Sequence, residues 1–163
     1  MKTATHNSYL ESLAGRALLL LAFCWAATDV AADSRFAPVA NDKWQAECGS
    51  CHLAYPPQLL PAVNWRNIMS RLDKHFGTDA TLDVATAAAI RTFLESNAAS
   101  GKRAAVSAGT LRISETPWFL REHRKVDAPV WKGAAVKTAA NCGACHTTAS
   151  RGDFGERGIR LPR

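Results

Sequence analysis

Two copies of one five-residue motif dominate the chemistry that this sequence can support. The first runs from Cys48 to His52 (CGSCH) and the second from Cys142 to His146 (CGACH). In a Cys-x-x-Cys-His motif, both thiols can bond to the vinyl groups of a porphyrin while the adjacent imidazole binds the iron. The two copies use four of the five cysteines, so we predict two covalently attached c-type haems. The predicted attachment residues are Cys48, Cys51, Cys142 and Cys145, and the predicted proximal iron ligands are His52 and His146.

Structural zinc and dithiol redox chemistry are the alternatives for these cysteines. Zinc ligand pairs are usually spaced apart, whereas here each histidine follows its second cysteine at once. A thioredoxin-like dithiol expects a βαβ context, and nothing around Cys48 or Cys142 predicts a strand. Covalent haem attachment is therefore the favoured interpretation.

The histidine count also predicts the second axial ligand of each iron. Apart from the two proximal ligands and His6, the sequence contains only His75 and His123. Each is expected at the apolar side or edge of a helix, where an imidazole can meet an iron away from water. We predict that His75 serves the first haem and His123 the second by chain proximity, with the crossed arrangement left open.

Met69 is the rival ligand for the first haem, because methionine ligation is common in cytochromes c. It lies six residues from His75, about 120° around a helix, so the two side chains cannot both address one iron. We expect Met69 to pack in the core.

The N-terminal segment, residues 1–32, is predicted to be a secretory signal peptide. Lys2 and Arg16 precede a short apolar run over 17–27, and small residues lead to a cleavage site after Ala32. The run is too short for a membrane span, although failure to cleave it would leave an N-terminal anchor. Export agrees with c-type haem attachment, so we expect a periplasmic protein with one domain over 33–163.

The basic balance of the chain favours a redox partner over a nucleic acid. The formal net charge is +6. Four haem propionates would offset most of this charge and leave a modest basic surface suited to transient docking with an acidic partner. We expect a monomer with no small-molecule substrate.

The remaining pattern predicts a mainly α fold, a small helical c-type cytochrome with long loops wrapping the haems. The first haem half covers about 33–98, with helices over 38–51 and 83–97 and a proline-rich loop after His52. A further helix between them is predicted to end at Gly77. Its apolar stripe consists of Trp65, Ile68, Met69, Leu72 and Phe76.

The second haem half covers about 110–163 and follows a predicted linker over 96–110. A brief extended segment is expected over 111–114, and Thr116-Pro117 should begin a helix with Phe119 and His123 on one face. Another helix is expected from Pro129 to Cys142, interrupted at Gly133. The Gly- and Arg-rich tail over 151–163 should be irregular and cover the second haem with Phe154 and Ile159.

Several stretches together resemble the bacterial dihaem cytochrome c family. They are the run from Cys48 to Pro61 (CHLAYPPQLLP at its end), Trp65, His75-Phe76-Gly77 and Gly152-Asp153-Phe154. The resemblance implies a periplasmic, mainly helical electron carrier with two covalent haems and bis-histidine ligation. It also implies electron delivery between a membrane cytochrome b and a small high-spin cytochrome c.

Two other function classes stay open from the residues alone. One is a small haem enzyme, either peroxidase-like or thiosulfate-oxidising, and the other is a haem-based gas sensor. Dihaem peroxidases are much longer and leave one iron open, and a thiosulfate-oxidising cytochrome would need a spare cysteine as ligand. Two irons with ligands on both faces have no open coordination position, which favours electron transfer. Exposure of the reduced protein to carbon monoxide separates the classes.

Overall fold

Short helices joined by long loops make up the described part of the chain, which is Phe36 and residues 39–162 of a computed structural model. These residues belong to one compact unit, Asp33–Arg163, and the predicted signal peptide lies outside them. The α-helices are α2 (Asp42–Cys48), α3 (Ala62–Met69), α4 (Val84–Ser96), α5 (Pro117–Glu122) and α6 (Ala128–Lys132). The predicted mainly α class is confirmed, since the described residues form no strand.

The described residues also form seven 3₁₀ turns, four between the α-helices and three after α6. They are Pro57–Leu59, Leu72–Lys74, Gly101–Ala104, Ile113–Glu115, Cys142–Ala144, Ala149–Arg151 and Glu156–Gly158. None of the helices in this part of the chain has the length and apolarity needed to cross a bilayer.

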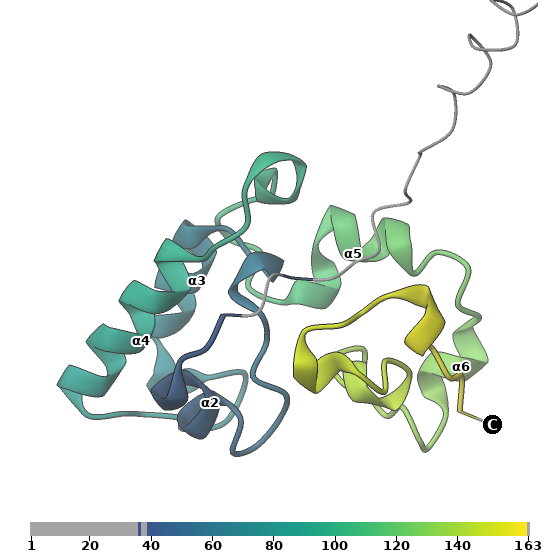
Figure 1. Cartoon of the computed structure of the whole chain (residues 1–163), viewed down its shortest axis with the longest axis horizontal. Helices are drawn as coiled ribbons and strands as arrows, with labels where there is room; N and C mark the ends of the chain where they lie inside the picture. Colours follow the sequence, from purple (N-terminus) through teal and green to yellow (C-terminus); the bar gives the residue numbers. More distant parts are fainter. Residues whose placement is uncertain (1–35, 37–38, 163) are drawn as a thin grey trace, which may run out of the picture. The chain divides into compact units, whose positions relative to one another are not determined.

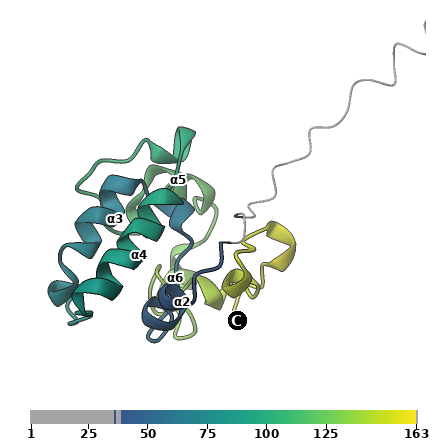
Figure 2. The same ribbon diagram turned by 60° about the vertical axis from the view of Figure 1, so that its left-hand side comes forward.

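The first half is organised around the packing of α3 against α4, which run side by side in Figures 1 and 2. The α4 helix begins as predicted, because the Asp83 side chain accepts a hydrogen bond from the Thr86 amide at 2.9 Å. Apolar side chains from α2, α3 and α4 and from the loop before α3 form one core. Its buried members are Trp44, Ala54, Leu60, Trp65, Ile68, Ile90 and Leu94.

The helix that carries Trp65 is shorter than the apolar pattern predicted. It ends at Met69, and Leu72–Lys74 forms a 3₁₀ turn instead of continuing to Gly77. The carbonyl of Leu72, which would bond the Phe76 amide in a helix, accepts the Ala80 amide at 2.8 Å. This loop closure turns the chain at His75, whereas Met69 packs against the core as expected.

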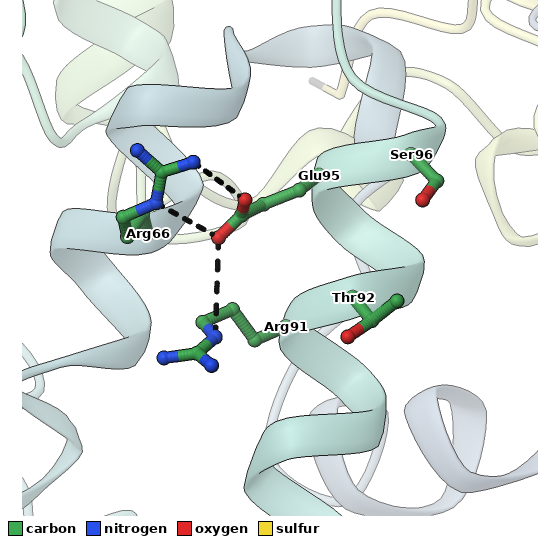
Figure 3. A pocket seen from close by; sticks show the side chains of 5 residues that line it. All are labelled: Arg66, Arg91, Thr92, Glu95 and Ser96. Carbon is green, nitrogen blue, oxygen red and sulfur yellow. Dashed lines mark hydrogen bonds and ion pairs between the residues drawn. The ribbon is translucent and has the colours of Figure 1, made fainter.

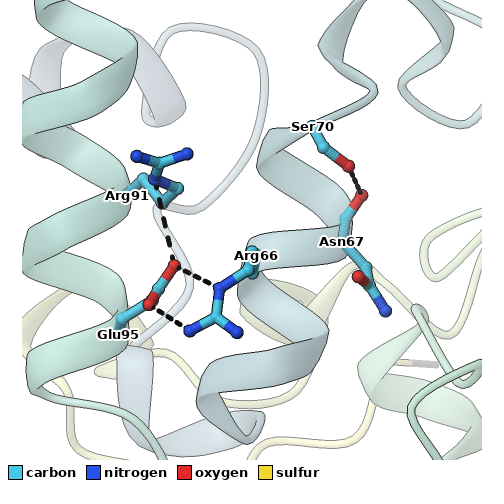
Figure 4. A network of polar contacts seen from close by, with 5 residues as sticks. All are labelled: Arg66, Asn67, Ser70, Arg91 and Glu95. Atoms are coloured by element: carbon cyan, nitrogen blue, oxygen red, sulfur yellow. Dashed lines mark hydrogen bonds and ion pairs between the residues drawn. The ribbon is translucent and has the colours of Figure 1, made fainter.

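A polar network lies on the outer face of α3 and α4. Arg66 donates two hydrogen bonds to the Glu95 carboxylate, at 3.1 and 2.6 Å, and Arg91 lies 3.9 Å from the same group (Figure 4). A shallow hollow beside this network is lined by Arg66, Arg91, Thr92, Glu95 and Ser96 (Figure 3). Because both arginine side chains are more than half exposed, we expect the ion pairs to contribute only modestly to stability.

The predicted linker is a folded segment anchored on α3. The buried Asn64 amide donates to the carbonyls of Ser107 and Thr110, at 2.8 and 2.7 Å. The extended segment predicted over 111–114 is wrong from Ile113 on: Arg112 has an extended backbone, but Ile113–Glu115 forms a 3₁₀ turn that leads into α5. The buried Asn64 amide, with two backbone acceptors, holds the linker at residues 107–110 against α3.

The second half contains less helix than predicted. The α5 helix has the expected Thr116 cap, whose side chain accepts from the Phe119 amide. The helix expected from Pro129 to Cys142 is wrong beyond Lys132, because Gly133 has an extended backbone and ends α6. The loop that follows places Val136 in the interior with 2% of its surface exposed. Burial of that side chain accounts for the irregular path.

Candidate haem sites

The first motif begins at the end of α2. Cys48 is the last residue of this helix, and the Gly49 amide bonds the Gln45 carbonyl at 3.0 Å. A Cβ atom on Gly49 would clash with that carbonyl oxygen, so the close approach requires glycine here. The chain then turns, leaving Cys51 and His52 exposed.

The His52 ring is oriented by its own backbone. Its Nδ1 lies 2.7 Å from the Leu53 carbonyl oxygen. A carbonyl only accepts, so this contact assigns the proton to Nδ1 and leaves the Nε2 lone pair for a metal. The arrangement is the one that an iron-binding histidine needs.

His75 faces His52 from the turn after α3. The two ring centroids are 6.1 Å apart and the ring planes differ by 21°. Phe76 and Gly77 follow with positive φ values of 49° and 99°. For Phe76 such a backbone costs about 1–3 kcal/mol, and the Arg112 guanidinium covers its ring at 4.4 Å. This strained turn, rather than a helix, presents His75.

The second motif forms a 3₁₀ turn under the C-terminal tail. The His146 amide bonds the Cys142 carbonyl at 2.8 Å, and the Arg160 amide bonds the Cys145 carbonyl at 2.9 Å. Thr147 adds a side-chain bond to the Gly158 carbonyl. The tail therefore crosses the second motif, next to the site that it was predicted to cover.

His123 is the C-cap residue that directly follows α5, and it faces His146. Its Nδ1 lies 2.9 Å from the Phe119 carbonyl oxygen, which again leaves Nε2 free. The Phe119 ring stacks on the imidazole with centroids 3.9 Å apart. The centroids of His123 and His146 are 6.0 Å apart, with their planes at 75°.

Both histidine pairs have the spacing that two axial ligands of one iron require. With a metal–nitrogen bond of about 2.0 Å and a ring centroid about 1.15 Å behind the nitrogen, trans imidazoles place their centroids about 6.3 Å apart. The observed separations are 6.1 and 6.0 Å. The structure thus brings His52 to His75 and His123 to His146, the pairing that chain proximity predicted.

An apolar cavity lies between His123 and His146. Cys142, Cys145, Phe154 and Ile159 line it, the last two as predicted. The sequence analysis missed other lining residues, which are Leu59, Ile113, Trp118, Val126, Val130, Trp131, Val136, Ala139, Asn141 and Leu161. Such a lining suits a porphyrin, which is largely apolar.

Leu59 is the most informative of the missed residues, because it belongs to the 3₁₀ turn after the first motif. The loop after His52 was expected to wrap the first haem, yet it also lines the cavity between His123 and His146. The only sequence signal was the apolar pair Leu59-Leu60 inside a proline-rich loop.

Burial favours the neutral form of two of the candidate ligands, His75 and His146. It lowers the pKa of His75, with a further contribution from His52, and it lowers the pKa of His146, with a further contribution from His123. Iron binds the neutral imidazole, so these shifts favour the ligand form. Burial also raises the pKa of Cys48 and of Cys142 to about 11, so both free thiols stay protonated at neutral pH.

The zinc alternative finds no support in the part of the chain that is described. Within it, no group of three or more histidine, cysteine, aspartate or glutamate side chains is placed to hold a metal ion directly. The donor set instead consists of a cysteine pair and two opposed imidazoles at each site, which fits a covalently attached haem.

Comparison with known proteins gives one consistent result. The family model "Dihaem cytochrome c" matches residues 44–154, which include both motifs and all four opposed histidines. None of the curated proteins matches the chain.

Solved structures of dihaem cytochromes resemble this chain over most of their length. A crystal structure of DHC from Rhodobacter sphaeroides shares 42% identity, with 72% of this chain and 100% of that chain covered and a TM-score of 0.64. A dihaem cytochrome c from Shewanella baltica OS155 shares 36% identity, with 75% and 93% covered and a TM-score of 0.66.

Proposed function

The chain belongs to the dihaem cytochrome c family, and on that premise we propose that it carries electrons in the periplasm between a membrane cytochrome b and a small soluble high-spin cytochrome c. At the level of the family it is an electron-transfer cytochrome with two covalently bound haem c groups. The compartment, the two partners and the ligand set below are the proposal.

The observation that carries the proposal is the pair of opposed imidazoles at each site. His52 faces His75 at 6.1 Å and His123 faces His146 at 6.0 Å between ring centroids. Histidines on both sides leave no open position for oxygen, peroxide or another substrate. This arrangement supports an electron carrier over a haem enzyme or a gas sensor.

At each site some residues would attach the haem and others orient its histidine ligands. Cys48 and Cys51 would hold the first haem, and Cys142 and Cys145 the second. The iron, when bound, supplies a one-electron couple. The backbone carbonyls that accept hydrogen bonds from His52 and His123 fix the orientation of those rings. The ligands would therefore rearrange little when the iron gains or loses an electron.

The charge distribution supports docking of an acidic partner at the second haem half. Residues 39–98 contain five basic and six acidic side chains, whereas residues 110–162 contain nine and five, and the linker adds Lys102 and Arg103. The basic excess of the described chain thus lies outside its first half and mostly in its second half. A basic surface steers an acidic partner toward productive encounters.

Salt dependence tests this docking. We expect electron transfer to an acidic cytochrome c to slow as ionic strength rises, because screening weakens steering. Replacing Lys125 and Lys132 with glutamate should slow it further, whereas the same change at Lys43 and Lys74 in the first half should have a smaller effect. Equal effects of the two double variants would contradict docking at the second half.

Ligand replacement tests the electron-carrier assignment. The ferric protein should be low-spin throughout, and the reduced protein should not bind carbon monoxide. His75→Ala and His123→Ala should each open one haem to carbon monoxide and leave the other closed. Met69→Leu is the matched control and should open neither. If Met69→Leu opens the first haem and His75→Ala does not, the ligand assignment at that site is wrong.

A further inference from the structure

Tyr55 makes two contacts that join the two haem sites. Its ring stacks on the His52 imidazole, with centroids 4.9 Å apart and planes within 25°. Its hydroxyl donates a hydrogen bond to the Ala140 carbonyl at 2.6 Å, across 85 residues of sequence. One side chain therefore touches the proximal histidine of the first site and the loop that leads into the second motif.

The end of this tether is held in place by other bonds. The Ala140 carbonyl also accepts the Cys142 amide at 3.0 Å, and the Ala140 amide donates to the Thr138 hydroxyl at 2.9 Å. Cys142 is a predicted attachment residue of the second haem. The Tyr55 hydroxyl is thus fixed against the backbone of that attachment site.

The two pairs of imidazoles differ in the angle between their planes. At the first site the rings of His52 and His75 differ by 21°, whereas at the second site those of His123 and His146 differ by 75°. An axial imidazole donates π-electron density perpendicular to its own plane. Two near-parallel rings therefore raise the energy of the same iron dπ orbital, which separates the two dπ orbitals widely in energy. Two near-perpendicular rings each raise the energy of a different dπ orbital, so the two orbitals stay close in energy.

Each site has an aromatic ring lying flat on one of its imidazoles. At the second site the Phe119 ring stacks on His123, and the Phe119 carbonyl accepts a hydrogen bond from its Nδ1. At the first site the Tyr55 ring stacks on His52, whereas the hydrogen bond from His52 Nδ1 goes to the Leu53 carbonyl. The two stacked rings restrict rotation of the imidazoles, because a turned imidazole would lose its stacking contact.

We propose that Tyr55 is a positioning residue that holds the His52 ring nearly parallel to that of His75, with its hydroxyl anchored on Ala140 beside the second haem. The first iron, when bound, would thereby differ electronically from the second. This inference rests on the ligand set of the proposed function, and it adds a residue that touches His52 without binding the iron.

Electron paramagnetic resonance of the frozen ferric holoprotein reads these plane angles directly. The unmodified protein should give two low-spin signals. One should be well-resolved and rhombic, from the near-parallel pair, and the other should have its largest g value at lower field, from the near-perpendicular pair. His75→Ala should remove the rhombic signal and thereby assign it to the first haem.

Tyr55→Phe keeps the stacked ring and removes the tether, and Tyr55→Leu removes both. We expect both variants to shift the rhombic signal, with the larger shift in Tyr55→Leu and no change in the second signal. Thr138→Val is the matched control, because it removes a hydroxyl bond to Ala140 without touching Tyr55. It should leave both signals in place.

Each remaining outcome overturns the inference in a recognisable way. A rhombic signal that is unchanged in Tyr55→Phe would show that the tether does not hold the ring, and this variant decides the matter even if Tyr55→Leu loses haem. Two indistinguishable signals in the unmodified protein would remove the difference between the sites. A high-spin signal in the unmodified ferric protein would instead overturn the ligand set, and the proposed function would then fail together with this inference.

Discussion

Replacing Thr116 with valine separates the cap of α5 from the other interactions that hold His123. The Thr116 side chain is buried, with 1% of the residue exposed. Its hydroxyl accepts from the Phe119 amide at 3.1 Å and donates to the Ile113 carbonyl at 2.9 Å. Valine keeps the shape of the side chain and removes both bonds.

The expected cost follows from these two bonds. An N-cap contributes about 0.5–2 kcal/mol and a further hydrogen bond about 0.5–1.5 kcal/mol. The Ile113 carbonyl keeps a second partner, the Thr116 amide, so we expect the lower part of the combined range, about 1–2 kcal/mol. With six residues, α5 is too short to form without its cap and its packing. The population of molecules in which α5 is open, and His123 released, should therefore rise roughly 5- to 30-fold.

Carbon monoxide binding to the reduced protein measures this open population. Thr116→Val should bind carbon monoxide slowly at one haem, at a rate that rises with the fraction of open molecules, while Thr116→Ser should behave like the unmodified protein. Asp83→Ala is the matched control, because it removes the cap of α4, which carries no axial histidine. If Thr116→Val lowers the free energy of unfolding but binds no carbon monoxide, α5 does not control His123.

Two other properties can be measured directly. Intact mass spectrometry of periplasmic material should give a chain beginning near Asp33 with two haems, and replacing both Cys142 and Cys145 with alanine should leave one haem; an unmodified polypeptide mass would contradict covalent attachment. The hydrogen bonds and charge of Arg66 lower the pKa of Glu95 below its ordinary value of 4.5, so this group stabilises the fold above that pH and stops doing so as pH falls through its lower folded pKa. Glu95→Gln should therefore lower the melting temperature at neutral pH, and the difference should shrink in acid; a constant difference would show that the carboxylate charge is not the cause.

Local signals in the sequence predicted several elements correctly. Asp83 and Thr116 begin α4 and α5 because their side-chain oxygens accept from amides three residues on, a contact that depends only on neighbouring residues. Phe119 and His123 share a face because four residues make about one helical turn, which is also a local property of the sequence. These features need no tertiary contact to be recognised.

Periodicity failed where a distant contact decided the path of the chain. The apolar stripe from Trp65 to Phe76 continues in the sequence after the helix has ended at Met69, because closure of the loop at Ala80 takes the Leu72 carbonyl. The helix predicted beyond Gly133 is absent because Val136 is drawn into the interior. Propensity alone carries no information about either contact.

The number and type of haems were readable from the sequence, because thioether attachment needs two cysteines and a histidine within five residues and nothing else nearby. The candidates for the opposite ligands were also readable, since His75 and His123 are what the histidine count leaves. Their distances and ring angles were not, because these depend on a strained turn at Phe76 and on the stacking of Tyr55 and Phe119. Such contacts join residues through space, and only the folded chain brings them together.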